Sequence, residues 1–177
     1  MLGLRHLGSF RNSHKPKDTY ARLSLMNMQT MIRPVDSSDH NDWLRMWTAY
    51  LEFYEQELSE ETTATTWKAL LKPAGHDCLV AVDSDTRKLV GFVTYLFHAS
   101  TWTQRGYCYL EDLYVVPESR RHGTGTCLIN AVVDVARSRK VSRVYWHTDQ
   151  ENATAQHLYR KVAKQSGMLQ FRISTES

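Results

Sequence analysis

The sequence has no apolar run approaching the roughly 20 residues that a membrane-spanning helix requires. It has few cysteines: Cys78, Cys108 and Cys127. Their odd number argues against a disulfide framework, and their spacing matches no metal-binding motif. These absences exclude a membrane helix and a disulfide-stapled module, and we therefore expect a reducing compartment, the cytoplasm and/or the nucleus.

The sequence has little net charge once its first residues are set apart. Residues 1–30 hold five basic side chains against one acidic side chain, a net charge of +4, so the remainder carries −1 of the formal total of +3. A nearly neutral domain lacks the basic face that binds nucleic acid, and we expect no such partner. We interpret residues 1–30 as a disordered extension or an over-long start, with a mitochondrial targeting segment as the alternative.

At 177 residues, 42% of them hydrophobic, the chain is long enough for one domain, which we place at residues 31–177. The apolar patterns predict strands at residues 31–35, 78–82, 89–97, 107–116, 141–148 and 168–173. Helix starts are predicted at Ser37, Ser38 or Asp39, at Ser59, after Gly125 and at Asn152. This order predicts an α/β fold, a mixed central β-sheet flanked by about four helices.

One stretch is more specific than these patterns. The strand 107–116 is closed by Pro117, and Arg120–Gly125 then fits R-x-x-G-x-G directly before an amphipathic helix. Glycines at the mouth of a helix let a ligand approach the backbone, where unpaired N–H groups and the helix dipole favour an anion. The stretch is not a dinucleotide motif, because G-x-G-x-x-G is absent, and it is not a P-loop, because no Gly-Lys-Ser/Thr follows.

A second motif follows the first along the chain. After the strand 141–148, Asn152-x-x-Ala155-x-x-Leu158-Tyr159 begins another helix. The order of these elements resembles the acetyl-CoA core of the GNAT N-acetyltransferases: a strand, R-x-x-G-x-G, a helix, a second strand and N-x-x-A-x-x-L-Y. Residues 109–115 resemble the spermidine/spermine and thialysine acetyltransferases, whereas the segments similar to the small histone, polyamine and D-amino-acid acetyltransferases are 96–102, 145–149 and 158–162.

The resemblance implies an enzyme that moves the acetyl group of acetyl-CoA to a primary amine by direct attack in a ternary complex, without a metal. Pantetheine would pair with the backbone of Leu113, Tyr114 and Val115. The pyrophosphate would rest on the N–H groups of Arg121, His122, Gly123, Thr124, Gly125 and Thr126. Arg120 would support that turn or contact a phosphate, and Asn152 would contact pantetheine or cap its helix.

The resemblance also implies two groups that transfer protons. Tyr159 matches the general acid that protonates the departing thiolate, and a packed core tyrosine is the alternative. Glu111 matches an acidic strand residue that helps to remove the amine proton through water. Asp112, which strand alternation puts on the opposite sheet face, His147 and water itself are the alternatives to Glu111.

Five glutamates gather around the predicted junction of the first two helices: Glu52, Glu55, Glu57, Glu60 and Glu61. They favour a cationic acceptor, although a solvated acidic face explains them as well. A polyamine, a lysine side chain in a peptide, an amino acid and a small drug-like amine all stay open as acceptors. Related enzymes imply a possible homodimer, and the alternative function is a catalytically silent acyl-CoA-binding module.

Overall fold

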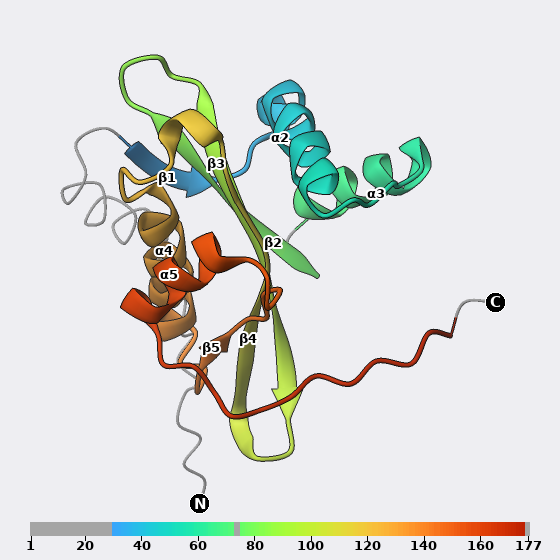
Figure 1. Cartoon of the computed structure of the whole chain (residues 1–177), viewed down its shortest axis with the longest axis vertical. Coiled ribbons are helices and arrows are strands. Elements are labelled where there is room, and N and C mark those ends of the chain that lie inside the picture. Colours follow the sequence, from blue (N-terminus) through green and yellow to red (C-terminus); the bar gives the residue numbers. More distant parts are fainter. Residues whose placement is uncertain (1–29, 73–74, 176–177) are drawn as a thin grey trace, which may run out of the picture.

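The computed structural model describes residues 30–72 and 75–175, in which five strands form one sheet (Figure 1). The strands lie side by side in chain order: β1 (Thr30–Pro34), β2 (His76–Asp83), β3 (Leu89–Ser100), β4 (Thr103–Val115) and β5 (Val144–Tyr145). The first four pair antiparallel, and β5 pairs parallel to β4. The predicted mixed sheet is therefore confirmed. The predicted extension lies outside the described residues, except that Thr30 already belongs to β1.

The described α-helices cover both faces of the sheet (Figure 1). One face carries α2 (His40–Phe53) and α3 (Glu60–Leu70), and the other carries α4 (Thr124–Ser138) and α5 (Ala153–Val162). Two short 3-10 turns, η1 (Ser37–Asp39) and η2 (Pro117–Ser119), precede α2 and α4. Nowhere in residues 30–72 and 75–175 is there a helix long and apolar enough to cross a membrane.

The two faces of the sheet have different cores. Beneath α4 the core is aliphatic, with Leu128 and Val132 packed on residues of β2 and β3. Beneath α2 and α3 it is aromatic: Trp43 stacks on Trp47 with ring centroids 5.5 Å apart and lies 4.9 Å from Trp67. Outside both cores, Trp102 at the β3–β4 turn is 83% exposed. Aromatic side chains therefore hold the α2–α3 layer to the sheet.

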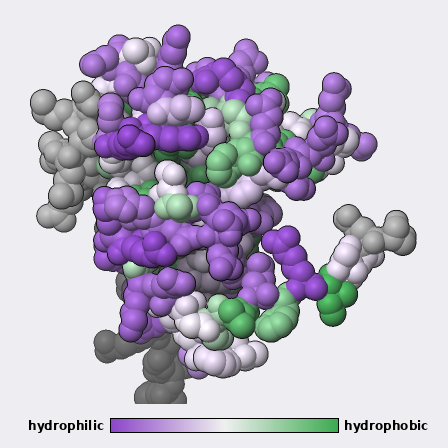
Figure 2. Space-filling view, viewed as in Figure 1, coloured by the Kyte–Doolittle hydropathy of each residue, from purple (hydrophilic) through white to green (hydrophobic). Residues whose placement is uncertain are grey.

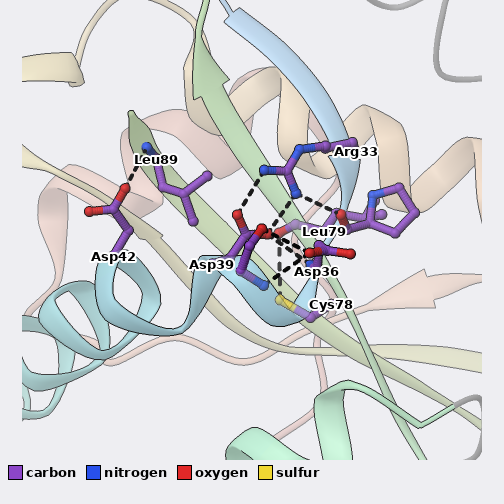
Figure 3. A network of polar contacts seen from close by, with 9 residues as sticks. Arg33, Asp36, Asp39, Asp42, Cys78, Leu79 and Leu89 are labelled. Atoms are coloured by element: carbon purple, nitrogen blue, oxygen red, sulfur yellow. Dashed lines mark hydrogen bonds and ion pairs between the residues drawn. The ribbon is translucent and has the colours of Figure 1, made fainter. Parts of the chain in front are cut away.

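A polar network fixes the entry to α2 (Figure 3). Asp36 is the N-cap of η1, since its carboxylate accepts the Ser38 N–H at 2.9 Å and its own N–H donates to the Asp39 carboxylate at 2.8 Å. Arg33 holds Asp39 from β1 through bonds of 2.6 and 2.8 Å. Of the three predicted caps, Asp39 is the N-cap position of α2, although its side chain makes no capping hydrogen bond there. Ser37 and Ser38 are wrong, because η1 starts the helical path early and the capping side chain lies upstream at Asp36.

The predicted cap at Ser59 is confirmed, because its hydroxyl accepts the Thr62 N–H at 3.1 Å at the start of α3. The predicted strand 141–148 is shorter than expected, since only Val144 and Tyr145 pair with β4. Val141 instead closes the end of α4 by donating its N–H to Ala136 O at 3.1 Å. The first residue of the apolar run therefore hydrogen-bonds to the end of α4 and not to the sheet.

The predicted strand 168–173 is wrong. Residues 163–175, which we call the C-terminal arm, carry no secondary structure and are exposed along their whole length (Figure 1). Four apolar side chains of the arm are 81–92% exposed: Met168, Leu169, Phe171 and Ile173. Figure 2 shows apolar side chains of the arm standing away from the body of the domain. A strand needs an edge to pair with, and β5 offers only two residues.

Candidate active site

The R-x-x-G-x-G motif forms the turn between β4 and α4. Arg121 and Gly123 both have left-handed backbones, with φ of +65° and +87°. The Arg120 Nε donates to Val115 O at 2.9 Å, and the hydroxyl of the buried Thr124 donates to Ser119 O at 3.3 Å. In this structure the exposed Arg120 side chain therefore links the turn to the end of β4.

The start of α4 presents backbone N–H groups at this turn. Gly123 is the N-cap of α4, and no described side chain caps it. The first turn of a helix has N–H groups without partners inside the helix, and it is the positive end of the helix dipole. Gly123 adds no side chain in front of these groups. The turn therefore has the geometry of an anion site.

The two sequence motifs touch each other. A Cβ atom on Gly125 would lie 2.9 Å from Cδ2 of Leu158, which is closer than real Cβ contacts allow. Gly125 therefore lets α5 pack against the start of α4. The second motif also starts as a cap: Asn152 Oδ1 accepts the Ala155 N–H at 3.0 Å. Of the two predicted roles for Asn152, capping its helix is the one that the structure contains.

One edge of β4 is open beside this turn. Leu113, Tyr114 and Val115 pair with β3 on one side. On the other side, β5 pairs with β4 only at Cys108 and Tyr109, and no further described strand follows. The backbone of residues 113–115 therefore has no strand on this side, where a ligand could pair as an additional strand would, although Val115 O already accepts the Arg120 Nε.

Tyr159 lies where α5 faces the end of α2. Its ring packs on Trp146 with centroids 5.2 Å apart, and the residue is only partly buried. Burial, and then the nearby Tyr54, raise the pKa of Tyr159 to about 12. Tyr159 therefore has both a packed ring and a hydroxyl that keeps its proton at neutral pH.

Tyr50, Tyr54 and Tyr159 form what we call the tyrosine cluster. Tyr50 and Tyr54 lie one turn apart at the end of α2, with ring centroids 5.0 Å apart. Burial raises the Tyr54 pKa, and the nearby Asn152 side chain acts in the opposite direction. Sequence reasoning missed the role of Tyr50 and Tyr54 because both fall on the apolar stripe of α2. The signal that could have found them is a pair of hydroxyl-bearing rings four residues apart.

A bulge in β4 changes the expected placement of the two carboxylates. Thr94 pairs with Asp112 and Tyr95 pairs with Leu110, so Glu111 is the additional residue. Asp112 accepts a bond from Tyr50 Oη at 2.8 Å, and Glu111 Oε2 lies 3.6 Å from His76 Nε2. The prediction that Glu111 and Asp112 lie on opposite faces is wrong. The bulge interrupts the alternation, so both carboxylates face the α2–α3 side.

The remaining predicted side chains are exposed to solvent. His147 is exposed, and its Nδ1 lies 3.2 Å from the Tyr109 hydroxyl, with its ring against Tyr109 and Tyr145. All five glutamates of the acidic group are solvent-exposed. Glu60 and Glu61 lie in the first turn of α3, where a negative charge is favourable for the helix dipole. The structure therefore brings Asp112, rather than His147 or these glutamates, to Tyr50 of the tyrosine cluster.

Comparison with known proteins agrees with this geometry. The model of the acetyltransferase (GNAT) family matches residues 42–163. A D-amino-acid N-acetyltransferase of Saccharomyces cerevisiae is 31% identical over 140 residues, 78% of this chain and 87% of that protein. A thialysine N-epsilon-acetyltransferase of Mus musculus is 34% identical over 163 residues, 84% and 94% of the two chains. The fold resembles AAC(6')-Iy in complex with the bisubstrate analogue CoA-S-monomethyl-acetylneamine, with a TM-score of 0.71, 15% identity and coverage of 82% of this chain and 97% of that chain.

Proposed function

Since this chain belongs to the GNAT acetyltransferase family and is an acetyl-CoA-dependent N-acetyltransferase, we propose that it acetylates a primary amine by direct attack within a ternary complex. The observation that carries the proposal is the meeting of α2, β4 and α5 around Tyr159. The tyrosine cluster lies beside Asp112, and the contact of Gly125 with Leu158 ties it to the turn before α4. Proton-transfer groups and an anion site thus share one place in the fold.

We propose that the backbone holds most of acetyl-CoA. The pantetheine arm pairs with the open edge of β4 at Leu113–Val115. The pyrophosphate accepts hydrogen bonds from the backbone N–H groups of residues 121–126. Arg120 holds the turn through its bond to Val115 O. The side chains of His122 and Thr124 then need no contact with the ligand, and the hydroxyl of Thr124 already donates to Ser119 O.

The chemistry needs a neutral amine and a proton for the departing thiolate. We propose that Glu111 receives the amine proton, through water, while the amine nitrogen forms a bond to the acetyl carbon. As the carbon–sulfur bond breaks, Tyr159 donates its proton to the thiolate, and solvent returns a proton to the phenolate. No covalent intermediate on the protein is needed, because positioning of the two substrates is sufficient.

We propose an acceptor that is cationic or zwitterionic. Two observations support this: Glu111 and Asp112 face the same side of the sheet, and the exposed glutamates between residues 52 and 61 border that side. The relatives are named for D-amino acids and for thialysine, which are both amine-bearing. Polyamines, lysine side chains and amino acids fit this charge.

Matched amines should test the acceptor through acetyl-CoA-dependent thiol release. Putrescine should have a higher kcat/KM than butylamine, and lysine should have a higher kcat/KM than glutamate, because the members of each pair differ in the charge of the distal group. Raising the salt from about 0.05 M to about 0.5 M should raise the KM for putrescine more than that for butylamine, because salt screens exposed charges. Preference for glutamate would contradict the proposed acceptor. Binding of acetyl-CoA with no turnover of any amine would instead favour the silent module.

We also propose a homodimer in which the C-terminal arm packs against a second copy of the chain. The four exposed apolar side chains of the arm support this, since burying each would contribute about 1.5–3 kcal/mol. A chain that ends at Lys164 should be monomeric by light scattering, whereas the full chain should be dimeric. Phe171→Ser combined with Ile173→Ser keeps the chain length and should also give monomers. The same number of chains per particle in all three proteins would refute the role of the arm.

The three cysteines are in no disulfide. We propose on this basis that the protein works in the reducing cytoplasm and/or nucleus.

A further inference from the structure

A set of hydrogen bonds surrounds the bulge in β4. Thr94 on β3 is 2% exposed, and its hydroxyl accepts the N–H of Asp112 at 3.1 Å and donates to Oδ2 of the same residue. Oδ1 of Asp112 accepts the Tyr50 hydroxyl at 2.8 Å. We call Thr94, Asp112 and Tyr50 the bulge clamp. The clamp joins β3, β4 and α2 at one point.

The clamp lies where the strand ladder is interrupted. The register passes from Thr94–Asp112 to Tyr95–Leu110, which leaves Glu111 without a partner on β3. A bulge disrupts the ladder locally and re-aims the side chains beside it, so its geometry depends on whatever holds the neighbouring residues. The neighbour here is Asp112, and both its backbone N–H and its carboxylate are bonded.

The chemistry of the clamp suits a fixed structural role. A hydroxyl buried in the apolar strand β3 would be costly without partners, and Thr94 has its partner in Asp112. Burial, and then the charge of Asp112, raise the pKa of Tyr50, so that its hydroxyl keeps its proton and remains a donor over the pH range of the assay. Both hydroxyls can therefore donate to Asp112 over the whole pH range of the assay.

We propose that the bulge clamp is a positioning device for Glu111. By holding Asp112 it sets the backbone of the bulge, and the bulge aims the Glu111 carboxylate at the acceptor amine. Thr94 and Tyr50 are thus positioning residues that act through Glu111, and the inference rests on the proposed function, in which Glu111 receives the amine proton.

The test is a cycle of four proteins: wild type, Thr94→Val, Glu111→Gln and the double variant. Valine keeps the branched shape of threonine and removes its hydroxyl. In the wild-type background Thr94→Val should lower kcat by about tenfold, because a small displacement of a catalytic group is costly. In the Glu111→Gln background it should lower kcat by less than about twofold, because residues that act through one another are not additive.

Two further measurements separate positioning from folding. Thr94→Ser keeps the hydroxyl and should hold kcat within about twofold of the wild type, since one good hydrogen-bonding partner is replaced by another. All variants should keep the thermal stabilisation by acetyl-CoA, which shows that the fold and the co-substrate site are intact.

Equal losses from Thr94→Val in both backgrounds would overturn the proposal, and so would full activity of Thr94→Val alone. The first of these results would point to Asp112 itself as the base. If Glu111→Gln kept full turnover, the clamp proposal and the role of Glu111 would both fail. Thiol release by the wild-type protein would still support acetyl transfer, so the two failures can be told apart.

Discussion

Replacing Tyr159 with phenylalanine is expected to lower kcat by roughly a hundredfold or more while acetyl-CoA binding persists, because the thiolate would leave without a general acid. The change removes one oxygen and keeps the ring that packs on Trp146. If Tyr159 were only a core residue, the variant would lose about 1 kcal/mol of stability at most and turnover would hardly change. The two roles therefore predict very different rates.

The measurement is kcat beside acetyl-CoA affinity and Tm, for both proteins at several pH values. An ordinary tyrosine, with a pKa of about 10, would lose half of its protons at about pH 10. Because burial raises the pKa of Tyr159 to about 12, the wild-type phenol stays protonated there, and its titration should not lower kcat up to that pH. Tyr107→Phe removes a phenol oxygen outside the tyrosine cluster and should keep full turnover. A folded Tyr159→Phe protein that binds acetyl-CoA and has near-normal kcat at every pH would remove Tyr159 from the mechanism.

Placing aspartate at Gly123 is expected to abolish the stabilisation by acetyl-CoA. Free ligand at a hundred times its dissociation constant should add about 2.7 kcal/mol to the wild-type stability if only the folded state binds. Gly123 has φ of +87° at the start of α4, which places an aspartate carboxylate beside the N–H groups that would receive the pyrophosphate. The carboxylate would then repel the ligand and compete for the same groups.

The matched control is Gly123→Asn. Asparagine and aspartate are the residues that adopt a left-handed backbone most readily after glycine, and they are similar in shape. Any strain from the positive φ should therefore appear equally in the Tm of both ligand-free variants. Gly123→Asn should keep a measurable shift in Tm with acetyl-CoA, and Gly123→Asp should show none. An unchanged shift in Gly123→Asp would mean that the pyrophosphate does not lie at this turn.

Local signals predicted much of the fold. The strands β2 and β3 and the Ser59 cap were all predicted, because each depends on residues that are neighbours in the chain. The helix α4 was predicted too, but it begins at Thr124 and not after Gly125. The two motifs also indicated the family, because they occur in the order and at the spacing of the family's pattern, and the family model matches residues 42–163. What they could not indicate is the contact of Gly125 with Leu158, which depends on how α4 and α5 pack in space.

Two of the errors have one physical origin. The bulge at Glu111 and the arm without secondary structure depend on partners distant in the chain or absent from it. The cap at Asp36 has a different cause, because its partners Ser38 and Asp39 are close in the chain. Alternation along β4 correctly marks a strand, but it cannot show that one residue is additional and that Asp112 turns to Tyr50. Likewise, the apolar pattern of residues 168–173 shows suitability for a sheet and not whether an edge is available.

The uneven distribution of tryptophan between the two faces of the sheet gives the protein its own optical reporters. Trp43, Trp47 and Trp67 are buried together under α2 and α3, so their fluorescence follows the integrity of that layer. Trp146 contacts the ring of Tyr159, and its emission follows the surroundings of the proposed acid. Trp102 is open to solvent, and a soluble quencher such as iodide reaches it first. When Trp102 is quenched, the remaining emission comes from the tryptophans of the α2–α3 layer and from Trp146 beside Tyr159.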